Sequence, residues 1–130
     1  MYYEECKSGS WKSRSVLVDS DSSSIDYARS GNSSGIYGVD NFCPGDISTC
    51  SIFAKGRYGE GQEIVNRCME KVRSQIERCD NLQGFQLMYS LSGGAGSGMG
   101  ANLINQLAEE YPNIIQFCPS LFPSTKNPTL

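Results

Sequence analysis

The chain has 130 residues, of which 38% are hydrophobic, and carries a formal net charge of −3. This length and composition suit one small globular domain. The acidic balance, without any basic block, excludes the positive surface by which proteins bind nucleic acid or an acidic membrane. The absence of histidine excludes Ser-His-Asp triads and H-E-x-x-H zinc proteases.

The sequence has no secretory leader and no apolar run long enough to span a membrane, so we expect a soluble intracellular protein. Six cysteines occur without any C-x-x-C spacing, and no histidine is present to complete a zinc site. We therefore expect free thiols. Two of them, Cys68 and Cys79, fall on the apolar face of a predicted helix, where thiols pack as small hydrophobic groups.

The first third of the chain predicts one strand and one short helix. Residues 15–19 (SVLVD) form a β-branched run that ends in a carboxylate, which predicts a buried strand with Asp19 at its carboxyl edge. A serine-rich stretch then offers helix N-caps and stops at Gly31, so we expect a short helix over about 24–30. Residues 31–56 are rich in loop-forming residues, and Pro44-Gly45 indicates a turn.

The middle of the chain predicts a long helix followed by a central strand. Between Glu60 and Cys79, apolar residues recur every three or four positions, which predicts about five helical turns. Residues 84–91 (GFQLMYSL) are too few for such a helix and too apolar for a surface loop, so they predict a buried strand. A glycine-rich segment follows this strand directly, at residues 90–100 (SLSGGAGSGMG).

Helical periodicity resumes at Met99 and continues to Tyr111, and residues 114–121 (IIQFCPSL) predict another strand. Strands that alternate with helices predict an α/β fold with a parallel sheet and helices on both faces. Ligands of such folds bind beyond the carboxyl ends of the strands. We therefore expect Asp19, Asp21 and the glycine-rich segment to line one edge of the sheet.

The glycine-rich segment predicts a phosphate site. Between a strand and a helix, glycines let backbone N–H groups approach a phosphate, and the helix dipole favours the negative charge. No Lys or Arg occurs between Arg78 and Lys126, and the G-K-[ST] ending of the Walker motif is absent. One alternative is that the small residues only permit close packing. Another is that Gly96-x-Gly98-x-x-Ala101 is a dinucleotide fingerprint, but the acid expected about twenty residues later is missing, since Glu110 is the last carboxylate side chain.

A triphosphate would need neutralisation from a source other than this segment. Mg²⁺ prefers carboxylate, water and phosphate oxygens, and Asp19 and Asp21 follow the first predicted strand. These two residues are the candidate metal ligands. The alternative is that they form a solvated turn that caps the next helix.

Several segments, in order along nearly the whole chain, resemble tubulins, and most closely the β-tubulin branch. The resemblance is carried by 82–87 (LQGFQL), the glycine-rich segment, 109–112 (EEYP), 14–19 (RSVLVD), 29–31 (RSG), 40–42 (DNF) and 54–61 (AKGRYGEG). It implies a GTP-binding, Mg²⁺-dependent cytoskeletal subunit that pairs with α-tubulin or other tubulin subunits in microtubules. Carried over by position, the implied phosphate contacts are Ser90, Gly93, Gly94, Ala95, Gly96 and Ser51, while Asp19 and Asp21 face the metal.

Some positions depart from the family pattern. Ser92 stands where the family usually has Gly, and Ala95 where it has Thr, so a hydroxyl near the outer phosphates is lost. Ser51 stands at the position of a phosphate-contacting Asn, and Asp21 is shorter than the usual Glu. These departures predict an impaired nucleotide site, with the alternative of a vestigial or interacting fragment that binds no nucleotide.

The resemblance covers a partial tubulin-type GTPase domain over 1–124, followed by a divergent tail over 125–130. It implies a partial, Rossmann-like three-layer fold that lacks its first central strand, which in the family lies between the counterparts of 16–19 and 85–91. The elements that complete hydrolysis are also not found, so we expect no turnover by this chain alone. The family implies a cytoplasmic, cytoskeletal location.

Overall fold

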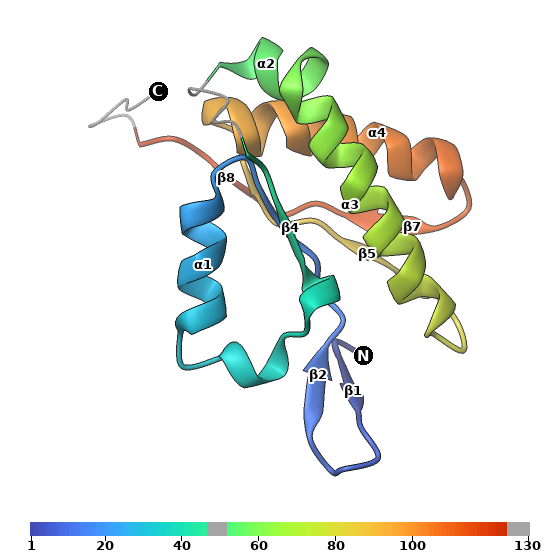
Figure 1. Cartoon of the computed structure of the whole chain (residues 1–130). Coiled ribbons are helices and arrows are strands. Elements are labelled where there is room, and N and C mark those ends of the chain that lie inside the picture. Colours follow the sequence, from blue (N-terminus) through green and yellow to red (C-terminus); the bar gives the residue numbers. More distant parts are fainter. Residues whose placement is uncertain (47–51, 125–130) are drawn as a thin grey trace.

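The computed structural model describes residues 1–46 and 52–124 (Figure 1). Ser51, a predicted phosphate contact, and the predicted tail 125–130 lie outside the described residues. No helix in the described ranges is long and apolar enough to cross a membrane.

An antiparallel hairpin precedes the first predicted strand. It joins β1 (Tyr3–Glu5) to β2 (Trp11–Ser13), and Tyr3 lies opposite Ser13. Gly9 takes a φ of 79° in the connecting turn, a conformation that suits glycine because it has no Cβ. Our sequence analysis missed this hairpin, since both strands are short and largely exposed and lack a buried apolar alternation.

A parallel pair of strands follows, β3 (Leu17–Asp19) and β4 (Phe42–Pro44). The crossover between them contains α1 (Ser22–Ser30), which confirms the predicted short helix with an earlier start, and the 3₁₀ turns η1 (Ser34–Ile36) and η2 (Val39–Asn41). Strand β4 lies inside the segment expected to be a loop. Its three residues are too few to show a periodic pattern before Pro44 ends the run.

Helices cover both faces of the β3–β4 pair. Phe42 faces α1, because the guanidinium carbon of Arg29 lies 4.9 Å from the centre of the Phe42 ring. The next residue, Cys43, points to the opposite face, where its Sγ lies 3.5 Å from the carbonyl oxygen of Ile64. This alternation places α1 on one side of the pair and the long helix on the other (Figure 1).

The long helix is confirmed as α3 (Glu60–Glu77), two residues shorter than predicted. It follows a six-residue helix, α2 (Phe53–Tyr58), which the sequence analysis missed. The apolar stripe of α3 forms the centre of the core, as predicted. Its fully buried side chains are Ile64, Val65, Cys68 and Met69.

The predicted strand over 84–91 is present in two pieces, β5 (Gly84–Gln86) and β6 (Tyr89–Ser90), but its residues are half-buried or exposed, not buried as expected, because in the described residues each piece pairs with one neighbour. They pair in parallel with β7 (Ile115–Phe117) and β8 (Ser120–Leu121), respectively. The amide of Leu87 donates to the carbonyl of Phe117 at 2.9 Å, so hydrogen bonding continues across the break. The two short ladders therefore act as one pair of parallel strands.

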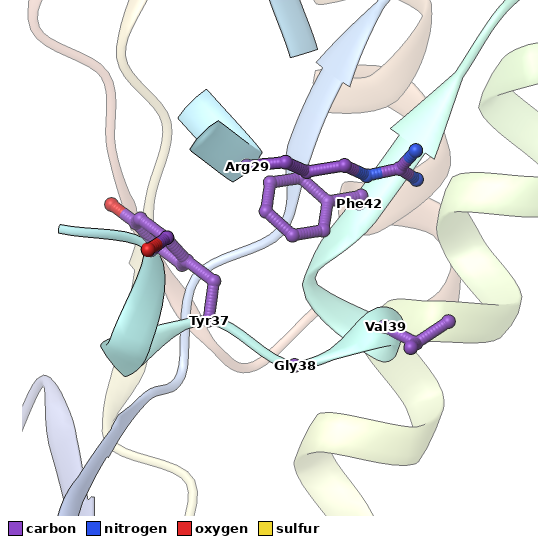
Figure 2. A pocket seen from close by; sticks show the side chains of 6 residues that line it. Arg29, Tyr37, Gly38, Val39 and Phe42 are labelled. Carbon is purple, nitrogen blue, oxygen red and sulfur yellow. The ribbon is translucent and has the colours of Figure 1, made fainter. Parts of the chain in front are cut away.

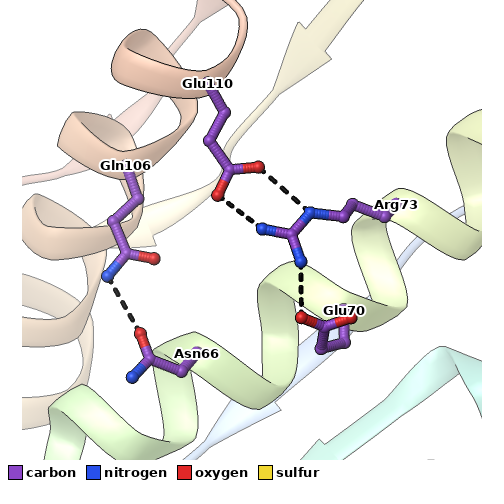
Figure 3. Close-up of polar contacts among 5 residues, drawn as sticks. All are labelled: Asn66, Glu70, Arg73, Gln106 and Glu110. Atoms are coloured by element: carbon purple, nitrogen blue, oxygen red, sulfur yellow. Dashed lines mark hydrogen bonds and ion pairs between the residues drawn. The ribbon is translucent and has the colours of Figure 1, made fainter.

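The helix that follows the glycine-rich segment is α4 (Gly100–Glu110). It packs beside α3, and polar side chains join the two helices along their exposed side (Figure 3). Arg73 donates two hydrogen bonds to the carboxylate of Glu110, at 2.7 and 3.1 Å, and a third to Glu70. These charge-assisted contacts raise the pKa of Arg73, with Glu110 as the main cause.

The fold is α/β and Rossmann-like, with parallel strands and helices, as predicted. Within the described residues, the β3–β4 pair and the β5–β8 strands are not hydrogen-bonded to each other. Our sequence analysis placed the family's first strand between these same segments. One apolar core nevertheless spans both pairs, since Val18 and Phe85 both pack against the α3 cluster.

Candidate functional site

The glycine-rich segment forms the start of a helix rather than a loop. Gly93–Met99 are a π-helical stretch, η3, that runs without interruption into α4. Ser92 precedes it in extended conformation and provides no side-chain cap. Because the first N–H groups of a helix have no partner within it, the amides at the start of η3 are available to an anion.

Gly93 is the glycine with the clearest conformational role. Its φ is +81°, and a Cβ at this position would meet no atom within 4 Å. The space beside Gly93 is therefore open, and its positive φ, which glycine adopts without steric cost, turns the chain from β6 into the helix. Gly96 lies closer to the strand, since a Cβ there would lie 2.8 Å from the carbonyl oxygen of Ser90.

Two other glycines serve close packing. A Cβ on Gly98 would lie 2.5 Å from the carbonyl oxygen of Phe53 in α2, and a Cβ on Gly56 would overlap the carbonyl oxygen of Gly94. Helix α2 thus rests directly on the backbone of η3. The packing alternative raised by the sequence holds for Gly98, whereas Gly93 has no packing role.

The sequence analysis did not foresee that α2 contributes to this region. Helix α2 carries Lys55 and Arg57 in its last turn, and Asn102 of α4 donates to the carbonyl of Arg57 at 3.3 Å. Positive charge is therefore present beside a segment that has no Lys or Arg of its own. The resemblance of 54–61 to tubulins was the one sign in the sequence that this stretch matters. Helix α2 itself is too short to predict from periodicity.

The serine hydroxyls around the segment are already engaged. Ser90 Oγ and Ser92 Oγ are hydrogen-bonded at 2.9 Å, and the Ser92 amide donates to Ser90 Oγ at 3.2 Å. The hydroxyl of Ser97 donates to the carbonyl of Gly93. Ser92, which replaces the family's usual glycine, is therefore hydrogen-bonded twice to Ser90 Oγ. The hydroxyl of Ser90 is a predicted phosphate contact.

The two candidate metal ligands form the turn before α1. Asp19 Oδ1 accepts from the amide of Asp21 at 3.1 Å, and Asp21 Oδ1 accepts from the amide of Ser23 at 3.0 Å. The hydrogen bonds from the amide and the hydroxyl of Ser23 lower the pKa of Asp21, which is exposed. Asp21 is thus the N-cap of α1, the role that the alternative reading gave it.

The same carboxylates suit Mg²⁺ only in combination with other oxygens. In residues 1–46 and 52–124 no group of three or more Cys, Asp or Glu side chains is arranged to hold a metal. Mg²⁺ usually keeps several waters and binds one or two carboxylates together with phosphate oxygens. Two aspartate carboxylates in a turn fit that requirement if a nucleotide supplies the remaining ligands.

The aspartate turn and the glycine-rich segment lie toward the same end of the molecule. Asp19 ends β3 and Ser90 ends β6, and both strands run toward the upper left of Figure 1, where α1 and η3 begin. The turn is also tied to the end of β4, since the amide of Gly45 donates to the carbonyl of Asp19 at 2.7 Å. This is the edge at which the sequence predicts a ligand.

A separate depression of about 370 Å³ lies between α1 and β4 (Figure 2). Arg29, Tyr37 and Phe42 form its walls, and the rings of Tyr37 and Phe42 meet edge to face at 5.6 Å. It lies at the start of β4 and the end of α1, so it belongs to the opposite end of these elements from the aspartate turn.

Comparison with known proteins identifies the family of the chain. The GTPase domain of the Tubulin/FtsZ family matches residues 1–129. The chain belongs to the Tubulin/FtsZ family. It is also 41% identical over 126 residues to the tubulin beta chain of Saccharomyces cerevisiae, which confirms the β-like resemblance. The match covers 97% of this chain and 28% of the yeast protein, so the tubulin-like sequence spans less than a third of that relative.

Proposed function

We propose that the chain is a tubulin-like, GTP-binding cytoskeletal subunit with a weakened nucleotide site. The observation that carries the proposal is the open helix start at Gly93, directly after the carboxyl end of β6. Its free amides and the helix dipole supply the attraction for phosphate that basic side chains supply elsewhere. Gly93, Gly94, Ala95 and Gly96 would contact the phosphates through their backbone.

Mg²⁺ would bind on the side of Asp19 and Asp21 and neutralise the phosphates. Both carboxylates are at the carboxyl edge of β3, and the lowered pKa of Asp21 keeps that carboxylate ionised. In this proposal the aspartates hold water and metal, while the glycine-rich segment holds phosphate. The proposed activity is binding without turnover by this chain alone.

Substitution of Asp21 tests the metal side of the site. Asp21→Asn keeps an N-cap acceptor for the Ser23 amide and removes the negative charge, because Asn and Asp cap helices about equally well. A thermal melt with and without GTP and Mg²⁺ measures binding, since a ligand at 100 times its dissociation constant adds roughly 2.7 kcal/mol of stability. We expect the stabilisation by GTP to depend on Mg²⁺ in the original chain and to shrink in Asp21→Asn.

Asp26→Asn is the matched control, since it removes a carboxylate from the same helix at an exposed site that pairs with Arg29. This variant should keep the full stabilisation by GTP. Equal losses in the two variants would mean a general charge effect. If millimolar GTP does not stabilise the original chain, the proposed nucleotide binding is wrong.

The weakening itself is testable by reversal. Ser92→Gly frees the hydroxyl of Ser90 from its 2.9 Å hydrogen bond, and Ala95→Thr restores the hydroxyl that the family pattern has near the outer phosphates. We expect each variant to bind GTP more tightly, and the two effects to add. Titration with a fluorescent GTP analogue measures the dissociation constants, and unchanged constants in both variants would contradict an impairment located at these positions.

The proposed partners are α-tubulin or other tubulin subunits, and the proposed location is the cytoplasmic cytoskeleton. Co-sedimentation with assembling microtubules, with GTP present or omitted, tests both. A second candidate function is an interacting fragment that binds no nucleotide, and the Ser90–Ser92 hydrogen bond favours it because that bond occupies a predicted phosphate contact. Co-sedimentation that is independent of GTP, together with no shift of the melt, would support this second function.

A further inference from the structure

Two cysteines from distant parts of the chain meet in the core. Cys43 lies on β4 and Cys68 on α3, and each side chain is only 1% exposed. Both belong to the central cluster, in which Val65 and Met69 are their fully buried neighbours. Neither residue has a place in the proposed nucleotide site.

The contacts of Cys43 place it against the face of α3 that carries Cys68. Cys43 Sγ lies 3.5 Å from the carbonyl oxygen of Ile64, one helical turn before Cys68 on α3. Residues four apart lie on the same face of a helix, so the Cys68 side chain lies on the face of α3 that Cys43 contacts. The thiol pair therefore bridges the strand and the helix that packs on it.

The pair differs from the other described cysteines. Cys79 is held separately, since it receives a hydrogen bond from Arg14 at 3.1 Å and donates to the carbonyl of Gln75 at 3.3 Å. Cys6 and Cys118 are partly exposed free thiols. No contact with another sulfur is described for these three residues.

The two thiols of the pair are also chemically unequal. The hydrogen bond from Cys68 lowers the pKa of Cys43 to about 7, with help from the charges of Arg67 and Lys71, although burial acts in the opposite direction. The same hydrogen bond, together with burial, raises the pKa of Cys68. Cys43 is thus the sulfur that ionises first, and Cys68 keeps its proton until its partner has reacted.

We propose that Cys43 and Cys68 are an oxidation site that forms a disulfide between β4 and α3 in the presence of hydrogen peroxide. Peroxide, which is nearly as small as water, reaches the pair when the β4 end of the core opens locally. A disulfide here would join two segments that only non-covalent contacts hold together in the reduced chain.

The reaction has two balanced steps. The thiolate of Cys43 attacks one oxygen of peroxide, the O–O bond breaks, and a sulfenic acid and a hydroxide ion form. The sulfur of Cys68 then attacks the Cys43 sulfur, the S–O bond breaks, and the thiol proton leaves with the oxygen as water. In total, two thiols and one hydrogen peroxide give one disulfide and two water molecules.

Disulfide mapping of the full chain tests the proposal. The reduced chain is treated with peroxide in native buffer, its remaining thiols are alkylated under denaturing conditions, and it is cut before aspartate and after basic residues. These cuts release residues 40–45 and 68–71 as separate peptides, and they separate Cys43 from Cys50. We expect these two peptides to be joined, with the loss of two hydrogens, and to separate on reduction.

The same treatment in concentrated urea is the reference, because an unfolded chain pairs its cysteines without this preference. A native pattern that matches the urea pattern would overturn the proposal. So would the recovery of Cys43 and Cys68 as alkylated thiols while the partly exposed Cys6 and Cys118 are oxidised.

Two matched variants sharpen the result. Cys68→Val keeps an apolar side chain of similar size in the core, and it should leave Cys43 as a sulfenic acid that a dimedone probe captures. Cys79→Val removes a thiol just beyond the end of α3 and should leave the Cys43–Cys68 link intact. Loss of the Cys43–Cys68 disulfide in Cys79→Val would contradict the assignment. If Cys68→Val fails to fold, the comparison of the native and urea patterns of the original chain still tests the proposal.

Discussion

Asn41 shows how one side chain can hold several segments together. It is 4% exposed; its amide nitrogen donates to the carbonyls of Ser13 and Ser15 at 2.9 and 2.6 Å, and its Oδ1 accepts from the amide of Gly38 at 2.7 Å. The sequence marked 40–42 only as a family match. The role of Asn41 could not be predicted, because the two carbonyls to which it donates are 28 and 26 residues away.

We expect Asn41→Ala to destabilise the chain by about 2 to 3 kcal/mol, because it removes three hydrogen bonds between a buried side chain and partly buried backbone groups. Urea unfolding measures the change. Asn66→Ala is the control, since Asn66 is exposed and accepts a single hydrogen bond from Gln106 at 3.2 Å (Figure 3). A loss for Asn41→Ala no larger than that of the control would show that water replaces its hydrogen bonds.

The oxidation of Cys43 should depend on pH. Its thiolate reacts with peroxide, and the hydrogen bond from Cys68 with the charges of Arg67 and Lys71 brings its pKa to about 7. Protonation below this pKa suppresses the reaction, so the rate should rise between pH 6 and pH 8 and level off above. A time course of the disulfide by mass spectrometry measures it. A rate that rises only near the ordinary pKa of a free thiol would contradict the contact with Cys68.

At the scale of elements, periodicity predicted the long helices well and the short pieces poorly. Helix α3 was predicted almost in full, since six apolar positions recur along one face over 18 residues. Strand β4 and helix α2 are too short to show a pattern, and each lies among glycines and turn residues. Tertiary contacts decide their structure: β4 pairs with β3, and α2 packs on η3.

The glycine-rich segment was predicted at the right place with the wrong local structure. Its glycines indicated a loop up to Met99, but the helix begins at Gly93. Packing against α2 compensates for the low helix propensity of Gly94 and Gly98. The candidate site could therefore be found from the sequence, because the spacing of small residues is a local pattern. Which glycines pack and which are open to a ligand depends on contacts with α2, and these could not be predicted.

Gly98→Ala tests this division. The new Cβ would lie 2.5 Å from the carbonyl oxygen of Phe53, so α2 must move away, at a cost of about 1 to 3 kcal/mol for overpacking. Gly35→Ala is the control, since a Cβ there meets no atom within 4 Å. Chemical unfolding should show a loss for Gly98→Ala and little change for Gly35→Ala. Equal stabilities would mean that α2 adjusts freely.

At the scale of the whole molecule, the two parallel pairs differ in how they are covered. The β3–β4 pair has a helix on each face, whereas α3 and α4 cover one face of the β5–β8 strands. Phe85 points to these helices and meets the Tyr111 ring at 5.4 Å. Alternation then places Ile115 and Phe117 on the opposite face, where they are 75% and 63% exposed.

Parallel sheets are normally covered on both faces, so this apolar face is expected to find a partner. With Met88 and Leu121, which are 78% and 73% exposed, it offers roughly 600 Å² of apolar surface from four side chains. Two copies that meet through this face would bury on the order of 1,200 Å², which reaches the lower limit of stable interfaces. We therefore expect the chain to self-associate through the β5–β8 face.

Sedimentation velocity over a range of concentrations measures this association. Ile115→Thr combined with Phe117→Thr places strand-favouring, β-branched side chains at both positions and removes much of the apolar area. This double variant should shift the chain toward the monomer. Tyr27→Ser is the control, since Tyr27 is 82% exposed on α1. A chain that stays monomeric at all concentrations, or a double variant that associates as before, would contradict this interface. Association that both variants weaken equally would point to a general loss of apolar surface rather than to this face.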